Sequence, residues 1–212
     1  GATACMHAPF ADRPDTSGLR TLGDAEAYER MVAAHTAGLQ IAIHAIGDAA
    51  NRAAADLYAR LLAEHPGPHR HRVEHASVLD AATIEAFAEL GIACVVQPIG
   101  IRTEAHWLGD RLGQDRLRRT YPLRSLLDAG VNVAGSSDAP IESTDVLTAM
   151  DAAVHRDGIG DAEAITPAEA LAAYTTSAAT ARGAWSGRIE PGQPADLVVL
   201  SDDPLTAPLT SI

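Results

Sequence analysis

Short apolar runs alternate with longer amphipathic stretches along most of this chain, and this alternation limits the folds that it can adopt. We expect strands at residues 40–44, 71–75 and 92–96 and in the stretch that ends near Asp138. The apolar runs have no consistent polar face, and the connections between them are long enough to hold crossover helices. This pattern is typical of parallel strands that are covered on both faces. The sequence therefore predicts an α/β fold.

Helices are predicted between and after these strands. They occupy residues 24–39, 48–64, 80–90, 122–129, 144–155 and 167–184, and Gly91 is the expected C-cap of the third. A longer loop is expected to contain Trp107. Residues 187–204 differ, because they combine strand-like alternation with a Pro-Gly turn. They predict a β-hairpin formed by residues 187–190 and 195–200.

Composition excludes several classes of partner. A formal charge of −12 over 212 residues argues against nucleic acid and against an anionic membrane surface. No apolar run approaches the length of a membrane span, and the first residues lack the pattern of a signal peptide. The two cysteines form no disulfide framework, so a cytoplasmic location is expected. All 16 basic residues are arginine, which removes any chemistry that needs a lysine.

Polar side chains stand where the predicted strands end. The first strand ends on His44, the second on Glu74 and His75, the third on Gln97 and the fourth near Asp138. Because the strands are parallel, these ends meet at the carboxyl edge of the sheet, where α/β proteins place their active sites. Two imidazoles and a carboxylate are suitable ligands for a divalent transition metal. We therefore predict a metal site of His44, His75 and Asp138, with Asp138 also the catalytic base.

Each of these residues also has a purely structural explanation. A single strand-end histidine such as His44 or His75 is more often packed in the core, and Asp138 before Ala-Pro suits a turn cap. Glu74 should point to the opposite face of the strand from His75, and it is expected to form a salt bridge or to support a metal ligand. Ser136 precedes Asp138 by two residues, but no G-x-S-x-G elbow and no phosphate-binding glycine loop is present. Metal-assisted hydrolysis is therefore the chemistry that remains.

Three further residues are candidates for substrate contacts. Gln97 follows the third strand, and His106 and Trp107 lie in the loop expected above the same edge. A core position suits Trp107 equally well. The substrate is expected to be a small molecule, and its identity stays open because the loops that set specificity vary within one fold.

Six segments carry a resemblance to a known family. They are IHAIGDAANR, HRVEHAS, VVQP, YPLRSLLDAGVNVAGSSDAPI, ITPAEALAAYTTSAA and GRIEPGQPADLVVL. Together they resemble the C-terminal half of amidohydrolase family 3 proteins, the metal-dependent hydrolases similar to N-substituted formamide deformylase. The resemblance implies a (β/α)8 barrel in which residues 1–184 form roughly strands five to eight with their helices. Residues 185–212 would then belong to a small β-sandwich.

The resemblance also implies roles for individual residues. His44 and His75 match the metal-binding histidines of strands five and six, and Asp138 matches the aspartate that binds metal and takes a proton from the attacking water. The implied metal is zinc, although the same donors suit manganese, iron or cobalt. The implied reaction is hydrolysis of a non-peptide C–N bond in an amide or formamide by metal-activated water.

The chain lacks part of the family's pattern. The His-x-His pair of the first strand and the carboxylated lysine are absent, and only half of the barrel units are present. Such a half-barrel would expose two strand edges, so we expect a homo-oligomer or pairing with a missing N-terminal half. Two alternatives stay open: a non-catalytic fragment or remnant stabilised by oligomerisation, and a deaminase of the same superfamily.

Overall fold

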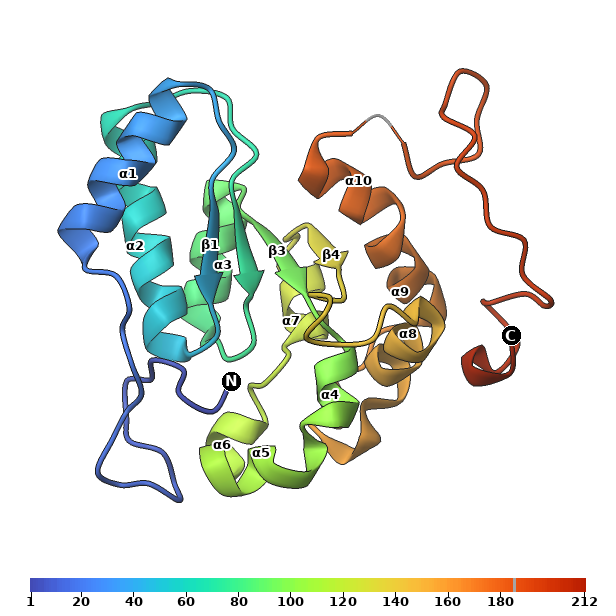
Figure 1. Cartoon of the computed structure of the whole chain (residues 1–212), viewed down its shortest axis with the longest axis horizontal. Helices are drawn as coiled ribbons and strands as arrows, with labels where there is room; N and C mark the ends of the chain where they lie inside the picture. Colours follow the sequence, from blue (N-terminus) through green and yellow to red (C-terminus); the bar gives the residue numbers. More distant parts are fainter. Residues whose placement is uncertain (185) are drawn as a thin grey trace.

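A parallel four-stranded sheet lies at the centre of the protein (Figure 1). The computed structural model describes residues 1–184 and 186–212. The strands are β1 (Ala42–Ala45), β2 (Arg72–His75), β3 (Ala93–Val96) and β4 (Val133–Gly135). They lie in the order β1-β2-β3-β4, each parallel to its neighbours, with helices in the connections. The predicted α/β class is confirmed.

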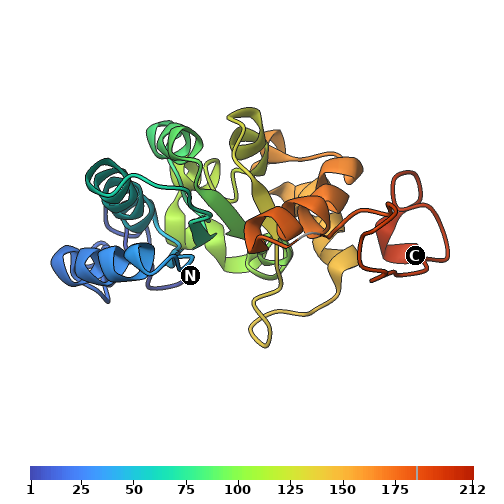
Figure 2. The same ribbon diagram turned by 90° about the horizontal axis from the view of Figure 1, so that it is seen from above.

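One face of the sheet packs against a row of helices. These are α1 (Asp24–Thr36), α2 (Asp48–Glu64), α3 (Ala81–Leu90) and α7 (Leu123–Asp128). Figure 2 shows α2, α3 and α7 side by side along this face. In α2 the buried Ala54, Tyr58 and Leu61 recur at helical spacing, which gives the helix its apolar stripe. The Tyr58 hydroxyl donates to the Arg72 carbonyl at 2.8 Å and so fixes α2 against β2.

The ends of α3 follow from its sequence. The Asp80 side chain accepts a hydrogen bond from the Thr83 N–H at 2.8 Å, which satisfies one of the free donors at the helix start. Gly91 adopts φ +65°, the left-handed conformation that ends many helices. The predicted C-cap is confirmed.

The other face of the sheet is covered only in part. Helix α10 (Thr176–Arg182) contributes an alanine-rich surface to β3 and β4, where Ala181 packs with Val95 and Ala134. Toward β1 this face is open, and Ala42 and His44 are exposed. The expectation that every strand is covered on both faces is therefore wrong for β1, because no described element packs over it there.

An ion pair occupies the same face on β2. The Arg72 guanidinium lies 2.6 Å from the Glu74 carboxylate, and the two side chains are 28% and 25% exposed. The expected salt bridge of Glu74 is confirmed.

The second half of the chain is more helical than predicted. Residues expected to be loop form α4 (Ile99–Thr103), α5 (Ala105–Leu112) and α6 (Gln114–Leu117). After β4 come α8 (Val146–His155) and the 3₁₀ turns η1 (Arg156–Gly158) and η2 (Asp161–Glu163).

The last predicted helix is divided into two. Helix α9 (Pro167–Tyr174) ends at Thr175, whose φ of −122° and ψ of −91° are not helical, and α10 begins at the next residue. The Tyr174 ring lies so close to Gly135 that a Cβ there would be 2.6 Å from it. The break therefore accompanies tight packing of α9 on β4 and lets α10 turn onto the sheet face.

The predicted hairpin does not form. Residues 186–212 contain no strand, and Ile189, Val198 and Val199 are 89%, 83% and 96% exposed. The alternation has no sheet to join among the described residues. The end of the chain returns to the body, where Leu209 in η3 (Leu209–Ser211) is buried against the core that includes α8. The predicted division between residues 1–184 and 185–212 stays a prediction, and residue 185 lies outside the described residues.

Membrane insertion through a helix finds no support in the structure. Across residues 1–184 and 186–212, no helix has both the length and the apolar character needed to span a bilayer.

Candidate metal centre

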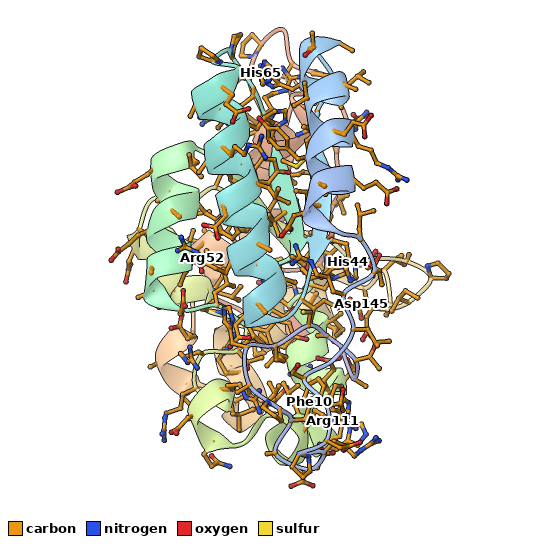
Figure 3. All side chains as sticks on the ribbon, turned by 90° about the vertical axis from the view of Figure 1, so that its left-hand side faces the viewer. Phe10, His44, Arg52, His65, Arg111 and Asp145 are labelled. Atoms are coloured by element: carbon orange, nitrogen blue, oxygen red, sulfur yellow. The ribbon has the colours of Figure 1, made fainter. Side chains whose placement is uncertain are left out.

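Two of the predicted metal ligands lie together at the carboxyl edge of the sheet. His44 is near the end of β1 and His75 ends β2, and the register sets these strands side by side. Their ring centroids are 4.4 Å apart, with an angle of 71° between the ring planes. His44 is exposed and His75 is half-buried. Figure 3 shows His44 toward the end of the sheet opposite His65.

The charge state of His44 suits metal binding. Although His44 is exposed, partial loss of solvent around its imidazole lowers the pKa of His44, and the neighbouring His75 imidazole lowers it further, while the carboxylates of Asp138 and Glu74 act in the opposite direction. A lowered pKa keeps the imidazole neutral near pH 7. Neutral imidazole is the form that binds a metal ion.

Gln97 connects this edge to the next two strands. It directly follows β3, is only 7% exposed, and its Oε1 lies 2.7 Å from His75 Nδ1. Its Nε2 donates to Ser136 Oγ at 2.8 Å and to the Val95 carbonyl at 3.3 Å. Its amide is thus committed to hydrogen bonds within the protein, and its predicted contact with substrate stays a prediction.

The partnership of Gln97 with Ser136 was not foreseen from the sequence. From the sequence, Ser136 is a candidate only as a nucleophile, whereas in the structure its hydroxyl accepts a hydrogen bond from Gln97. The strand register brings the two residues together, because Val96 pairs with Gly135, and Gln97 and Ser136 are the residues that follow them. Register could not be read from the sequence alone.

Asp138 does not complete a metal site in this structure. It lies beyond the end of β4, is exposed, and adopts φ +53°. Among the described residues, no group of three or more His, Cys, Asp or Glu side chains lies close enough together to hold a metal ion. The carboxylate is nevertheless near enough to act on the pKa of His44.

The two other predicted substrate residues lie on α5. His106 is exposed, and Trp107 is half-buried and packs against the main core. The Trp107 ring also approaches the start of the chain, since a Cβ on Gly1 would be 3.3 Å from its Cη2. The core position considered for Trp107 is therefore present, and substrate contact stays a prediction for both residues.

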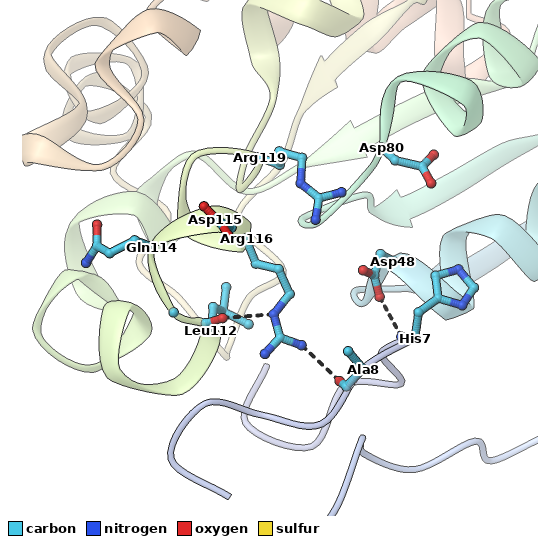
Figure 4. Close-up of a pocket in the computed structure, with 10 residues that line it drawn as sticks. His7, Ala8, Asp48, Asp80, Leu112, Gln114, Asp115, Arg116 and Arg119 are labelled. Carbon is cyan, nitrogen blue, oxygen red and sulfur yellow. Dashed lines mark hydrogen bonds between the residues drawn. The ribbon is translucent and has the colours of Figure 1, made fainter. Parts of the chain in front are cut away.

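A separate hollow of about 500 Å³ lies between the N-terminal loop, the starts of α2 and α3, and α6 (Figure 4). The Arg116 guanidinium donates to the carbonyls of Leu112 and Ala8 at 2.8 and 2.9 Å. The His7 N–H donates to the Asp48 carboxylate at 2.9 Å. Because these charged groups hold the N-terminal loop in place, we assign this hollow a structural role.

Comparison with known proteins places the chain in a family. A family model described as "Amidohydrolase family" matches residues 1–212. The chain belongs to the amidohydrolase family. The resemblance drawn from the sequence motifs is thereby confirmed.

Relatives of this amidohydrolase chain are considerably longer than it is. It is 34% identical to the putative amidohydrolase YtcJ of Bacillus subtilis (strain 168), over 96% of this chain and 40% of that protein. It is 33% identical to the N-substituted formamide deformylase of Arthrobacter pascens, over 89% of this chain and 36% of that protein. The chain therefore spans about two fifths of the length of these relatives.

A solved structure agrees with the fold. An uncharacterized metal-dependent hydrolase from Pyrococcus horikoshii OT3 superposes with a TM-score of 0.90 at 30% identity. The match covers 99% of this amidohydrolase chain and 43% of the other.

The two histidines suit a divalent metal as part of a larger ligand set. Their imidazoles come from adjacent strands, face each other at one edge, and differ in that His75 Nδ1 is already hydrogen-bonded. Metal sites of this kind use three or more protein ligands. His44 and His75 would supply two of them, and Asp138, whose carboxylate acts on the pKa of His44, is the sequence-predicted candidate for another.

Proposed function

We propose that the complete protein hydrolyses non-peptide C–N bonds with the help of a divalent metal, and that this chain supplies part of its active site. The observation that carries the proposal is the contact between His44 and His75 at the carboxyl edge of adjacent parallel strands. Membership of the amidohydrolase family supports it. Similarity to a protein named N-substituted formamide deformylase supports a small amide or formamide as substrate.

The architecture that we propose is half of a (β/α)8 barrel. Four consecutive parallel strands with a row of helices along one face are what such a half would contain, and β1 and β4 form its unpaired edges. Helix α10, which covers the other face at β3 and β4, is a departure from this pattern. The exposed face of β1 supports this arrangement, because it would meet the opposite wall of a closed barrel. The missing strands would come from the rest of a longer polypeptide or from a second copy of this chain.

In this proposal each residue has a defined task. His44 and His75 would hold the metal, and zinc is our first expectation. When bound, the metal would supply Lewis acidity, which activates water and polarises the substrate carbonyl. Asp138 would accept a proton from the attacking water and return it to the leaving nitrogen as the C–N bond breaks. Gln97 would keep His75 in place through its hydrogen bond.

A second candidate is a non-catalytic remnant, stabilised by oligomerisation, that holds no metal even in the complete protein. The observation that favours it is the lack of a third close ligand beside His44 and His75 in the described part of the chain. The two candidates differ in one measurable property, which is the amount of metal bound per chain.

Metal content tests the proposal. We expect close to one or two equivalents of zinc in the complete protein by ICP-MS, loss of this metal in His44→Ala/His75→Ala, and a parallel loss of amide hydrolysis. His155→Ala is the matched control, because this histidine is exposed and pairs with Asp151 on α8. Metal retained in the double variant would overturn the assignment of the ligands. A metal-free complete protein with a normal fold would favour the second candidate.

A further inference from the structure

We propose that Gln97 is a positioning residue that fixes the tautomer of His75 and leaves Nε2 as its metal-binding nitrogen. The tautomer follows from hydrogen bonds within this chain. The identification of Nε2 as a metal ligand rests on the proposed function.

The orientation of the Gln97 amide comes first. A glutamine amide has a donor end and an acceptor end. The Val95 carbonyl can only accept, and it lies 3.3 Å from Gln97 Nε2. Turning the amide over would set its oxygen against the oxygen of this carbonyl. The amino group must therefore face Val95 and Ser136, which leaves Oε1 on the side of His75.

The tautomer of His75 follows from this orientation. Oε1 can only accept, and it lies 2.7 Å from His75 Nδ1, so Nδ1 must carry the hydrogen. A neutral imidazole has one N–H, and its lone pair is then on Nε2. Because Gln97 is only 7% exposed, water has little access to compete for this hydrogen bond.

The backbone at His75 increases the need for such support. His75 and Ala76 adopt φ of +78° and +46°, a region that residues other than glycine rarely occupy. The His75 side chain is therefore attached to an unusual main-chain conformation at the last residue of β2. The Gln97 side chain, anchored on the ends of β3 and β4 through Val95 and Ser136, holds the ring across three strands.

The consequence for metal binding is specific. A partner that fixes the tautomer and ring direction of a ligating histidine commonly changes metal affinity by 10- to 100-fold. Gln97 acts through His75, and its buried amide needs no contact with substrate to do so. This role differs from the substrate contact predicted for it from the sequence.

The test reads the tautomer directly. Two-bond ¹H–¹⁵N spectra of ¹⁵N-histidine-labelled complete protein, stripped of metal and held at one pH, report which ring nitrogen carries the hydrogen. We expect the Nδ1–H form for His75 in the unmodified protein. Gln97→Met, which keeps the length without polar atoms, should give a mixture of tautomers. Gln97→Glu retains an acceptor for the His75 Nδ1 hydrogen but loses the donor to the Val95 carbonyl, so it should keep the Nδ1–H form while fixing the ring less firmly.

Zinc affinity provides the second readout, measured by competition with a chromophoric chelator. We expect Gln97→Met to weaken zinc binding about 10- to 100-fold, and Ser136→Ala to weaken it less, because the Val95 carbonyl still orients the amide. Circular dichroism establishes that each variant folds. If Gln97→Met does not fold, Gln97→Glu and Ser136→Ala carry the test.

The outcomes separate the two proposals. An Nε2–H tautomer in the unmodified protein, or an unchanged tautomer in Gln97→Met, overturns the role of Gln97. The expected tautomers combined with zinc binding that is insensitive to both Gln97→Met and His75→Ala support the role of Gln97 in the tautomer. That combination overturns His75 as a ligand.

Discussion

Arg156 is the largest fully buried side chain of the described residues, and it carries a charge. Its guanidinium donates three hydrogen bonds of 3.0 Å, to the carbonyls of Ile159, Tyr121 and Thr120. Burial lowers the pKa of Arg156 to about 10, and the carboxylates of Glu163 and Asp161 act in the opposite direction. The group is therefore still charged at neutral pH, and two of its three hydrogen bonds join the turn after α8 to the chain segment before α7.

Replacing Arg156 should be strongly destabilising. Arg156→Met leaves the buried carbonyls of Ile159 and Thr120 without this donor, whereas the Tyr121 carbonyl keeps the Leu123 N–H, and we expect a loss of about 3 kcal/mol in the free energy of unfolding. Arg156→Lys should lose somewhat less than Arg156→Met, because its ammonium can still donate to some of these carbonyls, although it cannot reach all three. Urea unfolding with an unchanged m-value measures the effect.

Arg118→Met is the control for this experiment. Arg118 is 69% exposed and pairs with Asp115 on the surface, so its loss should change stability by less than about 0.5 kcal/mol. Equal stability of the Arg156→Met and Arg118→Met variants would contradict the structural role of Arg156.

At the scale of elements, a chain of hydrogen bonds joins α1 to the amino ends of β1 and β2. The Ile41 N–H donates to His71 Nδ1 at 3.1 Å, so the hydrogen of a neutral His71 is on Nε2. This nitrogen lies 2.9 Å from His35 Nδ1, and His35 Nε2 lies 3.0 Å from the His65 carbonyl. Every donor has an acceptor only when both imidazoles are neutral.

This network predicts loss of stability in acid. His71 is 2% exposed, and burial followed by the neighbouring His69 and His35 lowers its pKa from 6.5 to about 4. Below pH 6.5 the unfolded chain binds more protons than the folded chain. The stability from this group is therefore present above 6.5 and is lost as the pH falls toward 4. The full loss is on the order of 3 kcal/mol.

His71→Asn separates this contribution from that of other groups. Asparagine retains an acceptor for the Ile41 N–H but does not titrate, so the variant should be less stable at pH 7 and vary less between pH 6.5 and 4.5. Urea unfolding at several pH values measures both properties. His106→Asn, at an exposed histidine, is the control, and its free energy of unfolding should vary with pH as steeply as that of the unmodified protein. An identical slope in His71→Asn would rule out the network as the cause.

Elements with a long periodic signal were predictable from the sequence. Helix α2 has the predicted bounds, and the four strands follow in the predicted order because each is a short apolar run between helices. Helices α4, α5 and α6 have only 5, 8 and 4 residues, too few for a period to be recognised. They depend on tertiary contacts such as the burial of Ile101 and Leu108.

The part of the candidate site that lies on the strands was predictable from the sequence, and the part in the loop after β4 was not. His44 and His75 end two neighbouring strands, so parallel topology alone predicts that they meet, and they do. Asp138 lies in a connection without periodic structure, where backbone geometry sets its position. Its φ of +53° has no signal in the sequence.

At the scale of the whole molecule, the sequence could not predict which surfaces are covered. Strand β3 is buried on both faces because α10 folds back over it, whereas β1 is not. Residues 187–200 have the pattern of strands but lie exposed without a partner sheet. An alternating pattern indicates that a segment is able to form a strand. Whether the strand forms depends on a partner strand elsewhere in the molecule, which the pattern does not reveal.

The exposed tail leads to a prediction for limited proteolysis. Thermolysin cleaves before large apolar residues, and Ile189, Val198 and Val199 are the most exposed of these in the tail. We expect the first cuts of this chain there, because the segment has few hydrogen bonds and little burial to protect it. Cleavage detaches the segment that carries the buried Leu209, so the remaining body should melt at a lower temperature once this segment dissociates, as measured by circular dichroism after cleavage and mass spectrometry.

The N-terminal loop is the internal comparison. It is also exposed around Leu19, but the Met6 N–H donates to Ser17 and the Leu19 N–H donates to Thr3, so it should be cut later. First cuts in this loop would contradict the division near residue 184. In the complete protein, the proposed β-sandwich should pair residues 187–200 and slow their cleavage. Equal rates in the chain and in the complete protein would mean that this segment has no partner strand there, which would contradict the proposed β-sandwich.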